Sequence, residues 1–141
     1  RRVQARITGA VRGGDADVGK HVLLVEDEVN IIEAIRFLLS REGWQVATHS
    51  DGVTALDTIR ATRPDLVVLD YMLPGKSGLD ILTELRADAE FQSLPVLMLT
   101  ARGQSRDREM AEKAGVSRFM TKPFSNTEVM TAVRDLVQLA Q

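Results

Sequence analysis

Five short apolar runs alternate with amphipathic stretches from residue 21 onward, and this alternation constrains the fold more than any other feature of the chain. The runs cover residues 22–25, 44–48, 66–69, 96–99 and 117–120. All are too short for helices, and three are continuously apolar, which is typical of strands buried on both faces of a parallel sheet. The chain is therefore predicted to fold as an α/β protein with helices on both faces of that sheet.

The segments between these runs carry helix signals. Apolar residues recur at helical spacing over residues 29–40, and Gly43 ends that segment. Further helices are predicted over residues 53–61, around residues 79–85 and over residues 107–114. Ser125 and Glu128 have the spacing of a capping box, so a last helix is expected to start there and run toward Leu139.

Composition excludes several classes of protein. The 141 residues include no cysteine and only two histidines, which rules out disulfides, thiolate nucleophiles and zinc-thiolate sites. No apolar run approaches the roughly 18 to 20 residues needed to cross a bilayer, so we expect no membrane partner. The absence of cysteine agrees with a cytoplasmic location, where thiols stay reduced.

Charge is unevenly distributed along the chain. Residues 1–20 hold five basic and two acidic side chains and four of the ten glycines, without an aromatic residue. Such a segment has little apolar surface to bury, so we predict that residues 1–20 form a disordered basic arm or linker. Residues 21–141 are predicted to form the folded domain. A solvated linker is favoured over a nucleic-acid-binding tail, because the charges are scattered.

Polar side chains follow four of the predicted strands. Glu26, Asp27 and Glu28 come after the first, Asp70 after the third, Thr100 after the fourth and Lys122 after the fifth. The carboxyl ends of parallel strands meet at one edge of the sheet, where such folds bind ligands. Clustered carboxylates without thiolates favour Mg²⁺, and Lys122 would balance the charge of a phosphoryl group. The alternative interpretation is that Asp27 or Glu28 only caps the following helix.

These residues and their neighbours resemble the signature of two-component response-regulator receiver domains. The matching segments are residues 26–27, 70–75, 100–101 and 122–124, in the order and at the spacing typical of that family. The resemblance covers about residues 20 to 140. It implies a flavodoxin-like, doubly wound (βα)₅ domain with strand order 2-1-3-4-5, acting as a signalling receiver rather than an enzyme.

The resemblance implies a phosphoryl-transfer site. Asp70 would accept a phosphoryl group from a sensor histidine kinase or a histidine phosphotransfer protein. The cofactor would be Mg²⁺, bound by Glu26, Asp27, Asp70 and the backbone carbonyl of Met72. A metal that bridges carboxylate and phosphoryl oxygens would neutralise charges that otherwise repel one another.

The resemblance also implies a switch and a way to tune it. Thr100, Ala101 and Lys122 would hold the phosphoryl oxygens. An inward move of Thr100 would then allow Phe119 to rotate inward, and the bond between Lys122 and Pro123 would be cis.

Two further positions tune the lifetime of the phosphoryl group in receivers, and here they hold Met72 and Arg102. Methionine cannot orient a hydrolytic water and arginine could cover the site, so we expect slow self-hydrolysis.

The sequence says less about the downstream partner of such a receiver. Receivers of winged-helix transcription factors typically carry two acidic residues and an arginine where this chain has Ser117, Arg118 and Ala132. No DNA-binding segment follows the last predicted helix. We therefore expect a stand-alone or excised receiver that signals to an unknown effector protein through its fourth helix, fifth strand and fifth helix, without direct nucleic-acid binding.

Two alternative functions, a phosphatase and a dinucleotide-binding domain, match the sequence less well than a receiver. A phosphatase of the haloacid dehalogenase type also uses an aspartate nucleophile with Mg²⁺, but it usually has a second Asp where this chain has Met72. A dinucleotide-binding domain would need Gly-x-Gly-x-x-Gly after the first strand, and that motif is absent there.

Overall fold

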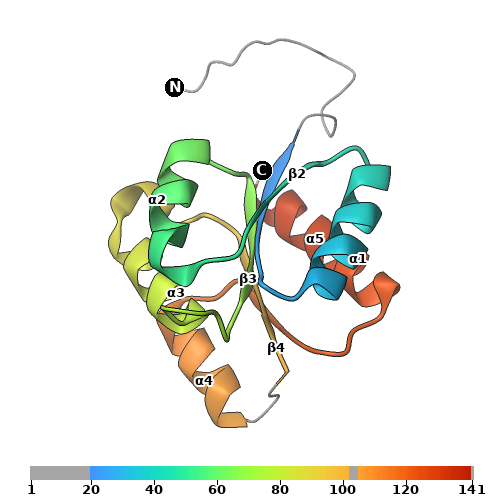
Figure 1. Cartoon of the computed structure of the whole chain (residues 1–141). Coiled ribbons are helices and arrows are strands. Elements are labelled where there is room, and N and C mark those ends of the chain that lie inside the picture. The colour runs from blue at the N-terminus through green and yellow to red at the C-terminus, as the bar shows by residue number, and fades with distance from the viewer. Residues whose placement is uncertain (1–19, 102–104, 141) are drawn as a thin grey trace.

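The computed structural model describes residues 20–101 and 105–140, which form alternating strands and helices (Figure 1). The strands are β1 (His21–Val25), β2 (Gln45–His49), β3 (Leu66–Asp70), β4 (Val96–Thr100) and β5 (Arg118–Thr121). The helices are α1 (Val29–Arg41), α2 (Gly52–Thr62), α3 (Gly78–Ala87), α4 (Ser105–Ala114) and α5 (Asn126–Ala140), with a 3₁₀ turn, η1 (Ala89–Phe91), after α3. The α/β prediction is confirmed.

All neighbouring strands of the sheet pair in parallel, in the order β2-β1-β3-β4-β5. This is the order that the resemblance implied. Helices α1 and α5 cover one face of the sheet, and α2, α3 and α4 cover the other (Figure 1). The carboxyl ends of all five strands therefore lie along a single edge.

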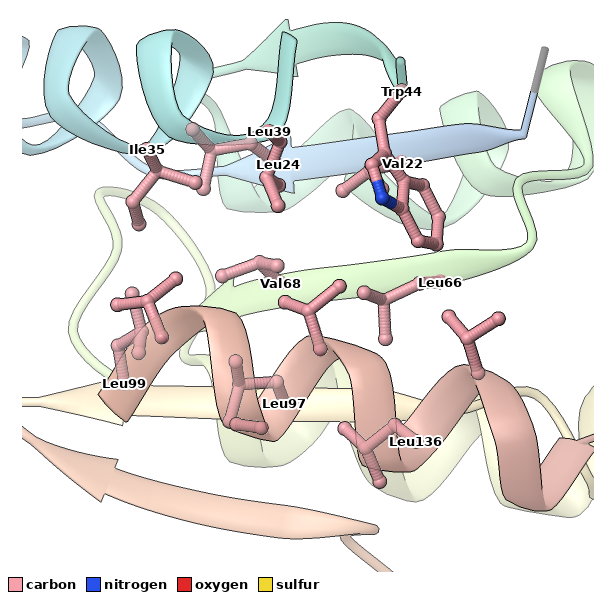
Figure 2. Close-up of a cluster of buried hydrophobic side chains, with 14 of the residues drawn as sticks. Val22, Leu24, Ile35, Leu39, Trp44, Leu66, Val68, Leu97, Leu99 and Leu136 are labelled. Atoms are coloured by element: carbon pink, nitrogen blue, oxygen red, sulfur yellow. The ribbon is translucent and has the colours of Figure 1, made fainter. Parts of the chain in front are cut away.

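Each face of the sheet has its own hydrophobic core. Along β1, Val22 and Leu24 pack toward α1 and α5 (Figure 2), whereas Leu23 and Val25 belong to the cluster beneath α2, α3 and α4. All five residues of β3 and of β4 are buried. Burial on both faces explains why these strands read as continuous apolar runs.

The two edge strands, β2 and β5, are not continuous apolar runs like β3 and β4. In β5, Met120 joins the core beneath α1 and α5, and Phe119 joins the opposite one. Trp44 was predicted to belong to the second strand but lies just before β2. Its backbone N–H donates to the Leu39 carbonyl over 3.1 Å. The Trp44 ring lies next to Val22 and Leu66 in the core that α1 and α5 cover (Figure 2).

The start of α5 confirms the predicted capping box. The Glu128 N–H donates to Ser125 Oγ over 3.1 Å, and the Ser125 N–H donates to Glu128 Oε1 over 2.8 Å. The predicted arm, residues 1–20, lies outside the described residues except for Lys20. Among the helices of the described residues, none has the length and apolar character required to cross a membrane.

Candidate functional site

Backbone pairing continues one residue beyond several strands and fixes the start of the loops that carry the polar side chains. The amides of Glu26, Tyr71 and Lys122 donate to carbonyls of neighbouring strands over 2.9, 2.7 and 2.7 Å. The Lys122 amide bonds to the carbonyl of Thr100. Residues from opposite ends of the chain are thus held at one edge of the sheet.

Three carboxylates meet at this edge, as the sequence predicted. One oxygen from each of Glu26, Asp27 and Asp70 lies within 4.8 Å of the others. Glu26 and Asp70 are buried, with 0% and 3% of their surface exposed, while Asp27 is exposed. The group is therefore open to solvent on the Asp27 side only.

Lys122 reaches into this carboxylate group. Its Nζ lies 2.8 Å from Glu28 Oε1, 3.1 Å from Glu26 Oε1 and 3.4 Å from Asp70 Oδ1. The side chain of Lys122 is only 9% exposed. The convergence of Lys122 on the carboxylates agrees with the prediction, and the bond between Lys122 and Pro123 is cis.

Glu28 was predicted to lie at this edge of the sheet and was considered only as a helix cap, so its contact with Lys122 was not predicted. It occupies the N-cap position of α1, as one alternative supposed, but its side chain makes no capping hydrogen bond. The carboxylate is bonded to Lys122 instead. The signal that could have revealed this is the position of Glu28 directly after Asp27, at the edge where Lys122 also emerges.

Only one of the two carboxylate oxygens of Glu26 accepts a hydrogen bond. Its Oε2 accepts a hydrogen bond from the Glu28 amide over 3.1 Å. Its Oε1 is buried without a hydrogen-bond partner, because Lys122 Nζ lies close enough for an ion pair but outside hydrogen-bond geometry. A buried carboxylate oxygen in this state is a ready ligand for a cation.

The acid groups are shifted toward their neutral forms. Burial, followed by the charge of Asp70, raises the pKa of Glu26 to about 7. Burial also raises the pKa of Asp70, although Lys122 opposes this. Burial alone would lower the pKa of Lys122, but its hydrogen bond to Glu28 and the nearby carboxylates of Glu26 and Asp70 raise it above the usual value of a lysine. Lys122 is thus held in its charged form.

This donor set fits a hard divalent cation. Carboxylate oxygens at one exposed and two buried positions match the preference of Mg²⁺ for oxygen ligands with room for water. Glu26 Oε1, which is ion-paired with Lys122 but accepts no hydrogen bond, supplies a further oxygen for such a cation. A divalent charge would also offset the repulsion by Asp70 that adds to the effect of burial on the pKa of Glu26.

Three of the other predicted residues, Thr100, Ala101 and Met72, follow strands β3 and β4 or end them, and they differ in burial. Thr100 is fully buried at the end of β4, and Ala101 follows it as an exposed residue. The Met72 amide donates to Asp70 Oδ1 over 3.3 Å, and the Met72 side chain is largely exposed. Arg102, predicted to tune the lifetime of the phosphoryl group, lies outside the described residues.

Gly78 allows the loop after Asp70 to fold back tightly. A Cβ at this position would lie 2.2 Å from the Asp70 carbonyl oxygen, which no side chain could accept. The Gly78 amide donates to the Tyr71 carbonyl over 2.9 Å and closes the loop. The loop geometry around Asp70 therefore depends on a glycine.

Phe119 lies away from the carboxylates, in the core beneath α2, α3 and α4. Its ring is 7% exposed and is covered by the guanidinium of Arg108, whose Cζ lies 4.9 Å from the ring centroid. Phe119 thus links β5 to α4, and its role as a switch remains a prediction.

Comparison with curated proteins places the chain among two-component regulators. Residues 22–134 match the model of the response regulator receiver domain. The chain is 45% identical over 117 residues to the probable transcriptional regulatory protein TcrX of Mycobacterium tuberculosis, covering 83% of this chain and 49% of that protein. It is 36% identical over 121 residues to the phosphate regulon regulator PhoB of Klebsiella pneumoniae, covering 86% of this chain and 53% of PhoB. The chain spans about half the length of these relatives.

Solved structures agree with this result. A response regulator from Chloroflexus aurantiacus superposes with a TM-score of 0.81 at 28% identity, covering 85% of this chain and 98% of that one. The receiver domain of a sensor histidine kinase from Pseudomonas aeruginosa, described with magnesium coordinated in its active-site cleft, gives 0.78 at 29% identity, covering 86% and 99%. With its fold, carboxylate group and sequence all in agreement, this chain belongs to the response regulator receiver domain family of two-component systems.

Proposed function

We propose that this receiver is a phosphoryl-accepting switch in which Asp70 takes the phosphoryl group. The observation that carries the proposal is the placement of Lys122 Nζ 3.4 Å from Asp70 Oδ1, inside a group of three carboxylates at the carboxyl edge of the sheet. A buried acid beside a buried cation is suited to nucleophilic attack on a phosphorus atom whose oxygens need counter-charge.

The chemistry follows from these groups. An Asp70 oxygen attacks the phosphorus of a phosphohistidine, and an O–P bond forms as the N–P bond breaks. The electron pair of the broken bond leaves with the imidazole nitrogen. Lys122 pairs with a phosphoryl oxygen, and the Thr100 hydroxyl and Ala101 amide are proposed to hold the others, because they lie at the carboxyl end of the neighbouring strand β4.

Mg²⁺ is the proposed cofactor. Glu26, Asp27, Asp70 and the Met72 carbonyl would hold it, and when bound it would supply positive charge to the reacting phosphoryl oxygens. The buried oxygen of Glu26 that accepts no hydrogen bond supports this assignment, as does the magnesium described for the Pseudomonas receiver. The phosphatase alternative is not favoured, because Met72 provides no acid or base beside Asp70.

The proposed phosphoryl donor is a sensor histidine kinase or a histidine phosphotransfer protein. Membership of the family supports this, and one matched structure is itself the receiver of a sensor histidine kinase. The compartment that we propose is the cytoplasm. Self-hydrolysis is proposed to be slow, since the exposed Met72 side chain offers no group that orients water.

The proposed output surface consists of α4, β5 and α5. A hollow of about 470 Å³ lies there, lined in part by Arg108, Phe119 and Glu128. Arg118, at a position where related regulators typically carry an acid, pairs with Asp135 of the same chain over 3.2 Å. The charge pattern therefore differs from that of winged-helix regulators, and we propose an effector protein as the partner rather than nucleic acid.

Intact-mass measurement after incubation with acetyl phosphate and Mg²⁺ tests this function. The native chain is expected to gain one phosphoryl group, and Asp70→Asn is expected to gain none. Omission of Mg²⁺ should abolish most of the gain. No adduct on the native chain, or an equal adduct on both chains, would contradict the proposal.

A further inference from the structure

Glu28 and Lys122 form the closest ion pair of the site, although 94 residues separate them in the sequence. Their atoms lie 2.8 Å apart, nearer than Lys122 lies to Glu26 or Asp70. The Glu28 side chain is 58% exposed, whereas Lys122 is 9% exposed. One partner of this pair can therefore leave for solvent, while the other is confined.

Because the Glu28 side chain is bonded to Lys122, it does not cap α1. Glu28 is the N-cap residue of α1, and an N-cap carboxylate commonly accepts a bond from an amide of the first helical turn. Here no such bond is made, and the carboxylate extends to Lys122. The helix dipole would favour the capping position, so the attraction of Lys122 competes with a local alternative.

The three partners of Lys122 differ in what their departure would require. Glu26 and Asp70 are buried. If either lost its contact with Lys122, its carboxylate would remain as a buried charge without a counter-charge. Glu28 can rotate into water, or into the capping position, without that cost. An incoming phosphoryl oxygen would therefore displace Glu28 more readily than the other two.

We propose that Glu28 is a positioning residue that holds Lys122 over the site before phosphorylation and is exchanged for a phosphoryl oxygen afterwards. This inference rests on the proposed function, because it assumes that Asp70 receives the phosphoryl group. Glu28 thereby competes with the phosphoryl group for the ammonium of Lys122. Loss of Glu28 should strengthen binding of a phosphoryl analogue through Lys122.

Calorimetric titration with beryllofluoride in the presence of saturating Mg²⁺ tests this exchange. Glu28→Gln is expected to bind beryllofluoride about two- to fivefold more tightly than the native chain, the range expected for loss of one partly exposed ion pair. Glu28→Asp is expected to show the same gain, because the shorter side chain no longer reaches Lys122 and is a preferred helix cap. Glu33→Gln, which removes a charge from the exposed side of α1, is the matched control and should leave the affinity unchanged.

A double variant separates the ion pair from the general loss of negative charge. In a Lys122→Gln background, Glu28→Gln should no longer increase the affinity. If the gain persists there, or if Glu28→Asp behaves like the native chain, the effect is long-range charge and the inference is wrong. A native chain that neither binds beryllofluoride nor gains a phosphoryl group contradicts the proposed function instead.

Discussion

Two partly buried cations, Lys122 and Arg86, lie at opposite edges of the sheet, and their surroundings differ in kind. At the carboxyl edge, Lys122 contacts three carboxylates that repel one another. At the amino edge, Arg86 donates to the carbonyls of Gly115 and Phe91 over 2.8 and 2.7 Å and to Ser117 Oγ over 3.3 Å. Neutral acceptors hold Arg86, whereas Lys122 is surrounded by an excess of negative charge.

This difference indicates that Arg86 stabilises the fold, whereas the Lys122 site is suited to bind a ligand. Arg86 joins the end of α3 to η1 and to the segment before β5, and its planar fork matches three fixed acceptors. Burial lowers the pKa of Arg86, but a guanidinium stays charged throughout the ordinary pH range. The Lys122 site keeps a carboxylate oxygen without a hydrogen bond and acids with raised pKa values. Such a site gains stability when a cation or a phosphoryl group enters.

The largest expected effect on stability is at the amino edge. Arg86→Ala should lower the free energy of unfolding by about 2–4 kcal/mol, because it removes three hydrogen bonds from a charged donor. Chemical denaturation measures this, and Arg118→Ala is the control, since its exposed ion pair contributes less than about 1 kcal/mol. Equal losses for the two variants would show that Arg86 is an ordinary surface arginine. Phosphorylation by acetyl phosphate should survive Arg86→Ala wherever the variant is folded.

An intermediate effect is expected at the carboxyl edge, with the opposite sign. The folded chain retains a proton on Glu26 up to about pH 7, while an unfolded chain loses it near the ordinary value of 4.5. The folded state therefore binds more protons between these values, and the free energy of unfolding without Mg²⁺ should fall as pH rises through this interval. Glu26→Gln should remove this fall and stabilise the metal-free chain by about 1 kcal/mol at pH 8.

The same variant provides its own controls. At pH 5, where native Glu26 is already protonated, Glu26→Gln should change stability little. Mg²⁺ should stabilise the native chain in thermal denaturation at pH 8, and it should stabilise Glu26→Gln much less. If Glu26→Gln destabilises the chain at pH 8, the site is not under the electrostatic strain inferred here.

The smallest effect is expected between the two edges, at the contact of Arg108 with Phe119. Arg108→Ala should lower the free energy of unfolding by about 0.5–1 kcal/mol, the contribution of one partly exposed cation–π contact. Arg106→Ala, an exposed arginine of the same helix, is the matched control. A loss as large as that of Arg86→Ala would mean that Arg108 has a second structural role.

The two edges also differ in how far the sequence predicted them. The carboxyl edge was predictable, because parallel strands bring residues such as Asp70 and Lys122 together whatever their separation in the chain. The strands themselves were recognisable from continuous burial, and α5 from its capping box. The Arg86 contacts were not predicted, since all three acceptors come from segments whose approach depends on tertiary packing.

Within the site, what sequence alone missed was the choice among neighbouring carboxylates. Glu28 looked like a helix cap, and only the position of Lys122 in the folded chain diverts its side chain. The raised pKa of Glu26 likewise depends on burial and on the distance to Asp70. Local patterns identify which residue types meet, but the three-dimensional distances decide how they share charge.

Backbone pairing beyond the strand ends has a consequence for the kinetics of signalling. The amides of Glu26, Tyr71 and Lys122 are bonded to neighbouring strands, so the main chain at the reacting residues is ordered together with the sheet. The conformational entropy of this segment is lost once, during folding, and not again each time a donor arrives. We therefore expect the proposed transfer to depend on side-chain rotations rather than on ordering of this main chain, and such rotations are fast on the timescale on which two proteins meet and separate.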